Sequence, residues 1–163
     1  MLVLYSVGHQ PPIRPNCESS MTMFIRYIEE ARQTIFHAKH QADRFGALEI
    51  EPEHILLALL KDQVLISRTM EGISEIEIRE TVDAYLARCE PNTLPHDLPL
   101  SKAARKALVL AEGEADKLGH LKIGNGHILL GLVDSGDSYA AGLLTKKGLS
   151  ADKVRRQLES PCF

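Results

Sequence analysis

Histidine has the widest chemical range of the residues in this chain, because a neutral imidazole can bind a metal or move a proton. Of the seven histidines, His37 and His40 are spaced i, i+3, which would place both rings on one face of a helix. The sequence places no third ligand beside them, and the zinc motif H-E-x-x-H does not occur. The residues therefore predict no metal site and no cofactor.

Two other histidines, His54 and His127, lie in copies of one motif, which reads E-H-I-L-L in the first half and G-H-I-L-L in the second. A histidine present in both halves favours packing or capping at a helix start over catalysis. The preceding residue differs between the copies. Glu53 lies in a first turn, where the helix dipole favours a carboxylate, and its counterpart is Gly126. The symmetry of the fold therefore does not require the acid at Glu53.

Two further motifs could indicate catalysis, but neither is complete. Gly124, Gly126 and Gly131 lack the spacing of a nucleotide-binding loop, and no G-x-x-x-x-G-K-[ST] occurs in the chain. Ser138 in G-D-S lacks both a nucleophile elbow and convincing histidine and acid partners. The printed sequence therefore predicts neither a P-loop ATPase nor another enzyme.

Composition narrows the class of protein. With 163 residues, 44% of them hydrophobic, the chain can form one core or two small ones, and it is too polar for a membrane span. A net charge of −3 gives no general attraction to nucleic acid, and a solvated helix face explains the basic residues near the end equally well. These are Lys146, Lys147, Lys153, Arg155 and Arg156. The cysteines show no C-x-x-C spacing, which indicates a reducing compartment and, by default, the cytoplasm. They are Cys17, Cys89 and Cys162.

An internal duplication supplies the elements that would position these residues. Residues 31–60 and 104–133 align without a gap at an offset of 73, and 13 of the 30 aligned positions are identical. After the aligned block the offset between the copies increases by three residues, because G-I-S at Gly72 pairs with G-L-S at Gly148. One helical unit is therefore used twice, with a different loop length between its second and third helices.

The sequence pattern of each unit predicts four helices. In the first unit, apolar residues recur at helical steps up to Gly46, Pro52 suits a first turn, and Ser74 opens a capping box. The expected helices span residues 24–45, 52–60, 64–70 and 75–88. The second unit repeats this order with a stop at Gly119 and with Asn125 as an N-cap. Its helices are expected over residues 101–118, 127–134, about 138–147 and from 151 onward.

The domain organisation follows from these helices and from Pro91, Pro95 and Pro99, which indicate a linker. Because a unit of about 70 residues is marginal alone, we expect one all-α domain of two tandem, pseudo-symmetric four-helix repeats. The expected boundaries are a leader over 1–22, repeat one over 23–88, a linker over 89–99, repeat two over 100–159 and a tail over 160–163. The leader lacks the basic n-region of a secretory signal. We expect either that it is a disordered extension or that translation begins at Met21 or Met23.

The duplicated motif is long enough to compare with a known family. It reads L-G-H-L-K-I-G-N-G-H-I-L-L-G-L in the second half and F-G-A-L-E-I-E-P-E-H-I-L-L-A-L-L in the first. These residues resemble the amino-terminal repeat domain of the Clp AAA+ unfoldases, whose motif is L-G-H-x-x-I-G-T-E-H-I-L-L-G-L. The resemblance covers essentially all of residues 23–159, including S-G-D-S-Y-A-A-G-L-L and K-G-L-S-A-D-K-V-R. It implies a fold of two four-helix repeats.

The resemblance also implies a site. In full-length members this domain precedes the ATPase rings and recruits substrates or adaptor proteins, without catalysis of its own. In the branch that handles arginine-phosphorylated proteins, the glutamate of the motif is implied to contact the phosphoarginine guanidinium. Glu53 matches that glutamate, whereas Gly126 replaces it in the second half. The family threonine before it is Pro52 in one half and Asn125 in the other. The motif residues expected to be structural are His54, Asn125, His127, Gly46 and Gly119.

We therefore expect a non-catalytic recognition module of the Clp quality-control system. Its partners would be unfolded or tagged protein clients, Clp adaptors or the Clp ring, and neither nucleic acid nor a membrane. The alternative is a small-molecule or stress-signal sensor that uses the groove between the repeats. The sequence contains no ATPase module, so a fragment and a stand-alone protein are both open, and the leader and the short tail favour a stand-alone protein.

Overall fold

A computed structural model describes residues 24–88 and 98–160 of the chain. The leader, the three cysteines and most of the expected linker lie outside these residues. The described part is all α-helical, as predicted, with four helices in each repeat. Repeat one contains α2 (Glu29–Arg44), α3 (Pro52–Leu59), α4 (Gln63–Thr69) and α5 (Glu75–Leu86). Repeat two contains α6 (Lys102–Lys117), α7 (Asn125–Ser135), α8 (Tyr139–Lys146) and α9 (Ala151–Glu159).

The first helix begins later than its apolar pattern predicts, at Glu29. Just before it, Tyr27 forms an isolated parallel bridge with Ile123 of repeat two. The Ile28 N–H donates to the Ile123 carbonyl at 3.0 Å, and the Ile123 N–H donates to the Arg26 carbonyl at 2.9 Å. The expectation of a helix here was wrong because this stretch pairs with a distant loop, which local periodicity does not reveal.

The same pairing recurs at an offset of 73 residues, where Leu100 bridges Ile50. The Ser101 N–H donates to the Ile50 carbonyl at 3.1 Å, and the Ile50 N–H donates to the Pro99 carbonyl at 2.8 Å. In each repeat, the residues just before the first helix therefore pair with a loop of the other repeat. This exchange gives the two halves their pseudo-twofold relation.

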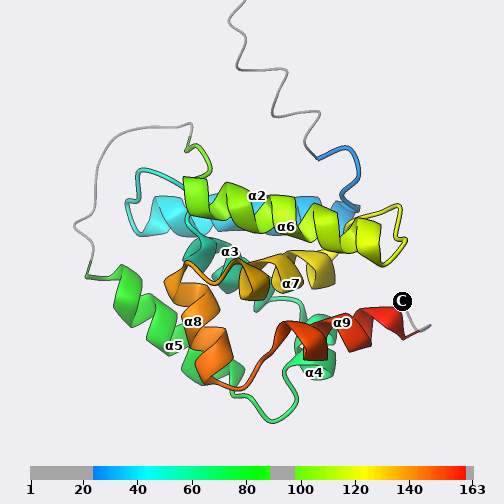
Figure 1. Ribbon diagram of the computed structural model, residues 1–163. Coiled ribbons are helices and arrows are strands. Elements are labelled where there is room, and N and C mark those ends of the chain that lie inside the picture. Colours follow the sequence, from blue (N-terminus) through cyan, green and yellow to red (C-terminus); the bar gives the residue numbers. More distant parts are fainter. Residues whose placement is uncertain (1–23, 89–97, 161–163) are drawn as a thin grey trace, which may run out of the picture.

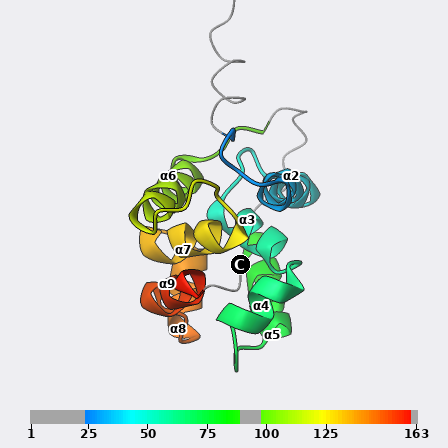
Figure 2. The ribbon, with the colours of Figure 1, turned by 90° about the vertical axis from the view of Figure 1, so that its right-hand side faces the viewer.

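The helices form three layers (Figures 1 and 2). Helices α2 and α6 form one outer layer, on opposite sides of it in Figure 2, and α3 and α7 lie beneath them. Below these, α5 with α8 occupies one end and α4 with α9 the other. Every residue of α3 and nearly every residue of α7 is buried, as expected for helices with long apolar runs. The starts of α3 and α7 therefore lie between the repeats.

Helices α2 and α6 end in the same Schellman motif. Gly46 has φ 63° and Gly119 has φ 71°, a left-handed conformation that glycine adopts without a Cβ penalty. In both, the amide after the glycine donates to the carbonyl five residues back, at 2.9 Å in repeat one and 2.8 Å in repeat two. The two glycines thus turn the chain into the loops that lead to α3 and α7.

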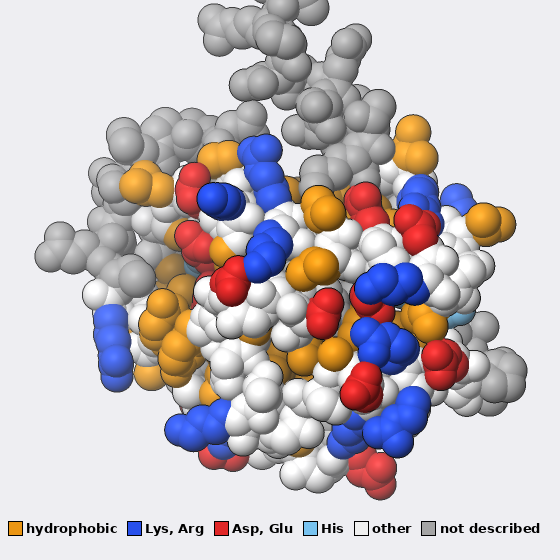
Figure 3. Space-filling view, in the orientation of Figure 1, with side chains coloured by type: hydrophobic (Ala, Val, Ile, Leu, Met, Phe, Trp, Pro, Cys, Tyr) orange, Lys and Arg blue, Asp and Glu red, His pale blue; other side chains and the backbone are white. Residues whose placement is uncertain are grey.

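Charged side chains of both signs are interspersed on the face that Figure 3 shows. Two basic residues near the end of the chain have acidic partners: Arg155 pairs with Glu114 and Asp152, and Lys147 pairs with Glu77. Over the two described ranges, no helix is both long and apolar enough to cross a membrane.

Candidate functional site

The two motif histidines cap the helices that begin between the repeats. His54 Nδ1 accepts a hydrogen bond from the Glu51 N–H at 2.9 Å, and His127 Nδ1 accepts one from the Gly124 N–H at 3.0 Å. Both rings are buried, and burial lowers the pKa of each to about 4. Since the accepting nitrogen must be unprotonated, both histidines act as neutral caps.

Asn125 is not the N-cap that its residue type predicts. The N-cap of α7 is Gly124, and Asn125 is the first helical residue, like its counterpart Pro52 in α3. Its side chain instead reaches the other repeat, where Nδ2 donates to Asp62 Oδ2 at 2.9 Å. Asp62 caps α4 by accepting a hydrogen bond from the Leu65 N–H. The start of α7 therefore stabilises the start of α4.

Glu53 makes the corresponding contact from α3. Its carboxylate accepts a hydrogen bond at 3.0 Å from the Ala140 N–H in the first turn of α8, and the residue is only 5% exposed. Burial raises the pKa of Glu53, although the Ala140 hydrogen bond acts in the opposite direction. The preceding residue, Tyr139, stacks on Tyr85 of α5 with ring centroids 3.9 Å apart. At this end of the molecule the carboxylate is therefore occupied within the fold.

A groove opens at the symmetry-related place, where Gly126 has no side chain. Its volume is about 810 Å³, and we call it the α4–α7 groove. Leu158 of α9 packs on Gly126 so closely that a Cβ there would lie 2.4 Å from Leu158 Cδ2. The apolar residues that line the groove include Ile28, Val64, Leu65, Leu121 and Leu158. Both repeats contribute to it, so neither could form it alone.

Large apolar side chains are exposed at the edge of the α4–α7 groove. Leu121 is 85% exposed, Val64 is 61% exposed and Ile28 is 36% exposed. Charged side chains also line it, and they include both acids and a base, namely Glu30, Asp62 and Lys122. An apolar hollow with few polar groups is the usual form of a binding site for a peptide or a small molecule.

One wall of the α4–α7 groove is the loop between α6 and α7. His127 Nε2 lies 2.8 Å from His120 Nδ1. Because His127 Nδ1 already accepts a hydrogen bond, the proton of the neutral ring is on Nε2, which donates a hydrogen bond to His120 Nδ1. Arg26 donates to the His120 carbonyl at 3.2 Å and to Asp116 at 2.6 Å. These contacts from the segment before α2 fix the loop beside the groove.

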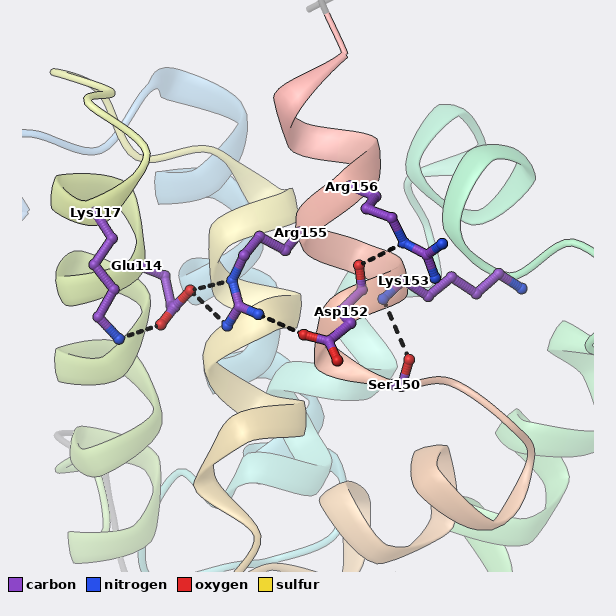
Figure 4. Close-up of polar contacts among 7 residues, drawn as sticks. All are labelled: Glu114, Lys117, Ser150, Asp152, Lys153, Arg155 and Arg156. Carbon is purple, nitrogen blue, oxygen red and sulfur yellow. Dashed lines mark hydrogen bonds and ion pairs between the residues drawn. The ribbon is translucent and has the colours of Figure 1, made fainter.

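A buried carboxylate fixes the opposite wall, which α9 provides (Figure 4). Glu114 of α6 lies between Lys117, at 2.6 Å, and Arg155 of α9, at 2.9 Å. Burial acts to raise the pKa of Glu114, but its hydrogen bonds with Lys117 and Arg155 lower it overall. Arg155 also pairs with Asp152 at 2.7 Å. The network anchors the helix that carries Leu158.

The other residues considered for chemistry have structural contacts. Ser138 caps α8 by accepting a hydrogen bond from the Ala141 N–H at 3.1 Å. Gly131 packs against α6, where a Cβ would lie 2.2 Å from the Ala107 carbonyl oxygen. No group of three His, Cys, Asp or Glu side chains in the described part of the chain could hold a metal ion.

Reasoning from the sequence expected a groove between the repeats but did not identify the residues that line the α4–α7 groove, because these come from distant segments. Two signals could have indicated it. Gly126 removes the side chain that Glu53 provides in the other copy, and Leu121 places a large apolar residue in a short loop. Its counterpart Leu48 is also exposed, at 55%, so an apolar loop residue alone does not mark the site.

Comparisons with known proteins agree on one family. The family model described as the Clp repeat (R) N-terminal domain matches residues 26–147 and 100–161. The negative regulator of genetic competence ClpC/MecB of Bacillus subtilis is 32% identical over 139 residues, which are 83% of this chain and 17% of that protein. The chaperone protein ClpB of Oceanobacillus iheyensis is 34% identical over 140 residues, with the same coverage. The chain therefore spans about a sixth of the length of these relatives.

A solved structure supports the fold. The complex of the ClpV N-domain with a VipB peptide superimposes with a TM-score of 0.69 at 17% identity, covering 94% of this chain and 95% of that one. At this identity the likeness concerns the fold alone.

Proposed function

Because this chain belongs to the Clp repeat N-terminal domain family, we propose that it is a non-catalytic recognition module of Clp-type protein quality control. It binds a segment of a client or adaptor protein in the α4–α7 groove. The exposed apolar side chains along that groove carry the proposal, because covering them with an apolar peptide face removes their surface from water. The ClpV N-domain, which has this fold, binds a peptide of VipB.

The groove favours a helical peptide over a single extended strand. All the elements around it are helices or loops, so it offers no sheet edge for main-chain pairing. An amphipathic helix can instead place apolar side chains at i, i+4 and i+7 along the groove. We therefore propose helix-in-groove binding, in the cytoplasmic setting that the sequence indicates.

The internal symmetry provides a matched test. The probe is a fluorescein-labelled amphipathic host peptide with leucines at i, i+4 and i+7, and binding to the full chain is measured by fluorescence anisotropy. Leu121→Ser removes an apolar contact at the groove and is expected to weaken binding about tenfold. Leu48→Ser changes the equivalent exposed residue of repeat one and should have no effect. Equal effects of the two substitutions, or no binding by the unaltered chain, would contradict the proposal.

Glu53 has a more restricted place in this proposal. The residue is only 5% exposed and its carboxylate accepts the Ala140 N–H, so the start of α8 would have to move before a phosphoarginine guanidinium could reach it. We propose that any such binding at repeat one requires a local opening of the α3–α8 contact. Calorimetric titration with free phosphoarginine, in parallel with Glu53→Ala, tests this. Binding that survives the substitution would remove Glu53 from the site.

A small-molecule sensor is the second candidate, and the volume of the α4–α7 groove favours it. About 810 Å³ lies within the range of ligand pockets in proteins. A thermal-shift screen separates the candidates, since a tightly bound ligand raises the unfolding temperature by mass action.

A further inference from the structure

Two polar side chains that line the α4–α7 groove have a hydrogen-bonding group that no other described residue uses. They are Asn125, the first residue of α7, and His120, in the loop before α7. Their counterparts in repeat one are Pro52 and Ala47, whose side chains carry no polar group. The pair therefore belongs to this groove alone of the two, and it bears on which peptide side chain the groove favours.

The free group of Asn125 is an acceptor. Its amide nitrogen lies 2.9 Å from Asp62 Oδ2, and since a carboxylate only accepts, this contact fixes Nδ2 toward Asp62. The amide oxygen, Oδ1, is then turned away from Asp62, and within the described ranges no group donates to it. Asn125 is only 8% exposed. Because a buried amide oxygen without a partner costs free energy, a ligand N–H that reached Oδ1 would gain a bond without displacing a protein donor.

The free group of His120 is a donor, and the capping contacts of α7 determine this. The Gly124 N–H only donates, so His127 Nδ1 accepts it and His127 Nε2 carries the proton. His127 Nε2 in turn donates to His120 Nδ1 at 2.8 Å, so the proton of His120 is on its own Nε2. No described residue accepts that N–H. The half-buried His120 ring thus presents one N–H donor beside the groove.

The charged residues that line the groove restrict the ligand further. Asp62 and Glu30 outnumber Lys122, which disfavours an acidic side chain. A basic side chain could pair with these acids and with Asn125 Oδ1, but it would leave the His120 N–H without an acceptor. A carboxamide carries one oxygen that accepts and one nitrogen that donates. An uncharged amide therefore matches both free groups.

We infer that the α4–α7 groove contains a subsite for a carboxamide side chain of the bound peptide, glutamine or asparagine. The His120 Nε2–H donates to the amide oxygen, and Asn125 Oδ1 accepts from the amide nitrogen. The inference rests on the proposed peptide binding and specifies one side chain of its ligand. A side chain and not the main chain supplies this amide, because the main-chain amides of a helical peptide pair within the helix.

The test varies position i+3 of the host peptide, which lies on the same helix face as its leucines. Glutamine, methionine, glutamate and lysine are compared at this position by fluorescence anisotropy with the full chain. Methionine is similar in size to glutamine but offers no amide. The glutamine peptide is expected to bind at least about fivefold more tightly than the methionine peptide, and more tightly than the other two. Tightest binding of the lysine peptide would mean that the acids select the side chain, and would overturn the inference.

Substitutions in the protein assign the effect to the two groups. The measured quantity is the dissociation constant of the methionine peptide divided by that of the glutamine peptide. A change in the shape of the groove weakens both peptides alike, so this ratio isolates the hydrogen bonds. His120→Ala and Asn125→Ala should each lower the ratio at least about twofold. Leu121→Ser is the control, which should weaken both peptides and leave the ratio unchanged. Circular dichroism checks that each variant is folded.

The unaltered chain alone separates this inference from the proposed function. If the glutamine peptide binds no more tightly than the methionine peptide, the carboxamide subsite is wrong while peptide binding stands. If none of the four peptides binds, the proposed function itself fails. The tautomer of His120 is checked without a peptide, by NMR of the ¹⁵N-labelled ring nitrogens at neutral pH. A proton on Nε2 alone is expected, and a proton on Nδ1 would remove the donor and overturn the inference.

Discussion

Helices α3 and α7 begin with the same histidine cap, yet they contact the opposite repeat in different ways. Glu53 in α3 accepts a hydrogen bond from the start of α8, and Asn125 in α7 donates one to Asp62 at the start of α4. The Glu53 carboxylate is buried, whereas Gly126 borders a groove with exposed apolar side chains. The cap that both helices need is duplicated, while the residue beside it differs and gives the two ends of the molecule different surfaces.

Acid should destabilise both repeats through the feature that they share, and we expect this to be the largest effect. His54 and His127 have pKa values of about 4 in the folded protein, against about 6.5 when unfolded. The unfolded state therefore binds more protons below pH 6.5, and stability falls between pH 6.5 and 4. The loss is on the order of 3 kcal/mol for each histidine. Urea unfolding across this pH range measures it.

Substituting each histidine in turn separates their contributions to the pH dependence of stability. His54→Gln should remove about half of this pH dependence, as should His127→Gln. A pH dependence that is intact in His54→Gln would show that the caps of the two repeats are not equivalent.

The first two helices should pack more closely in repeat two than in repeat one. A methyl group at Gly131 would overlap the backbone of α6, whereas its counterpart Ala58 already carries one. Gly131→Ala is therefore expected to lower the free energy of unfolding by about 2 to 3 kcal/mol. Ala58→Gly should cost about 1 kcal/mol through helix propensity and lost packing. Urea denaturation of both variants measures the difference, and a Gly131→Ala protein as stable as the unaltered chain would contradict the close approach.

The anchoring of α9 has no equivalent in repeat one, where Gln41 is the counterpart of Glu114. Glu114→Gln removes the charge that pairs with Arg155 and Lys117, and should cost about 1 to 2 kcal/mol at pH 7. The pKa of Glu114 is lowered in the folded state, so its contribution is present above the unfolded pKa and is lost as pH falls through the folded pKa. The stability difference between the two proteins should therefore shrink below about pH 4. A difference that persists at low pH would indicate packing and not charge.

Glu53 should show the smallest effect on stability. Because burial raises its pKa, the ionised carboxylate carries a cost above the folded pKa that disappears below the unfolded pKa. Glu53→Gln keeps an oxygen that can accept the Ala140 N–H and should change stability by less than about 1 kcal/mol at pH 7. The unaltered chain should gain stability relative to the variant as the pH is lowered. A loss well above that size on substitution would mean that the charge itself stabilises the α3–α8 contact.

Local patterns predicted most of the helices but not the contacts between the repeats. Pro52, Ser74 and Gly119 lie at helix ends whose geometry depends on neighbouring residues alone, and these ends are as expected. The capping box predicted at Ser74 is only half formed: Ser74 caps α5, but the Glu77 side chain pairs with Lys147 of repeat two. The start of α2 was misplaced because Tyr27 pairs with Ile123, which is distant in sequence. The N-cap of α7 was misplaced although the alignment of Asn125 with Pro52 indicated a first helical position.

The residues of the candidate site were harder to predict for the same reason. The alignment showed that Glu53 and Gly126 differ, but not that Glu53 contacts α8 or that Gly126 borders a groove. Both facts depend on which helix of one repeat lies against the start of another. Such contacts are set by the packing of the two repeats and not by the periodicity of either.

The most direct test of peptide binding at the α4–α7 groove is an NMR titration of the ¹⁵N-labelled chain with the leucine host peptide. We predict that amide shifts concentrate at Val64, Leu121 and Gly126, with little change at the counterpart positions Leu48 and Glu53. Shifts centred on Leu48 and Glu53, or no shift at any of these amides at a saturating peptide concentration, would contradict the assignment of recognition to this groove.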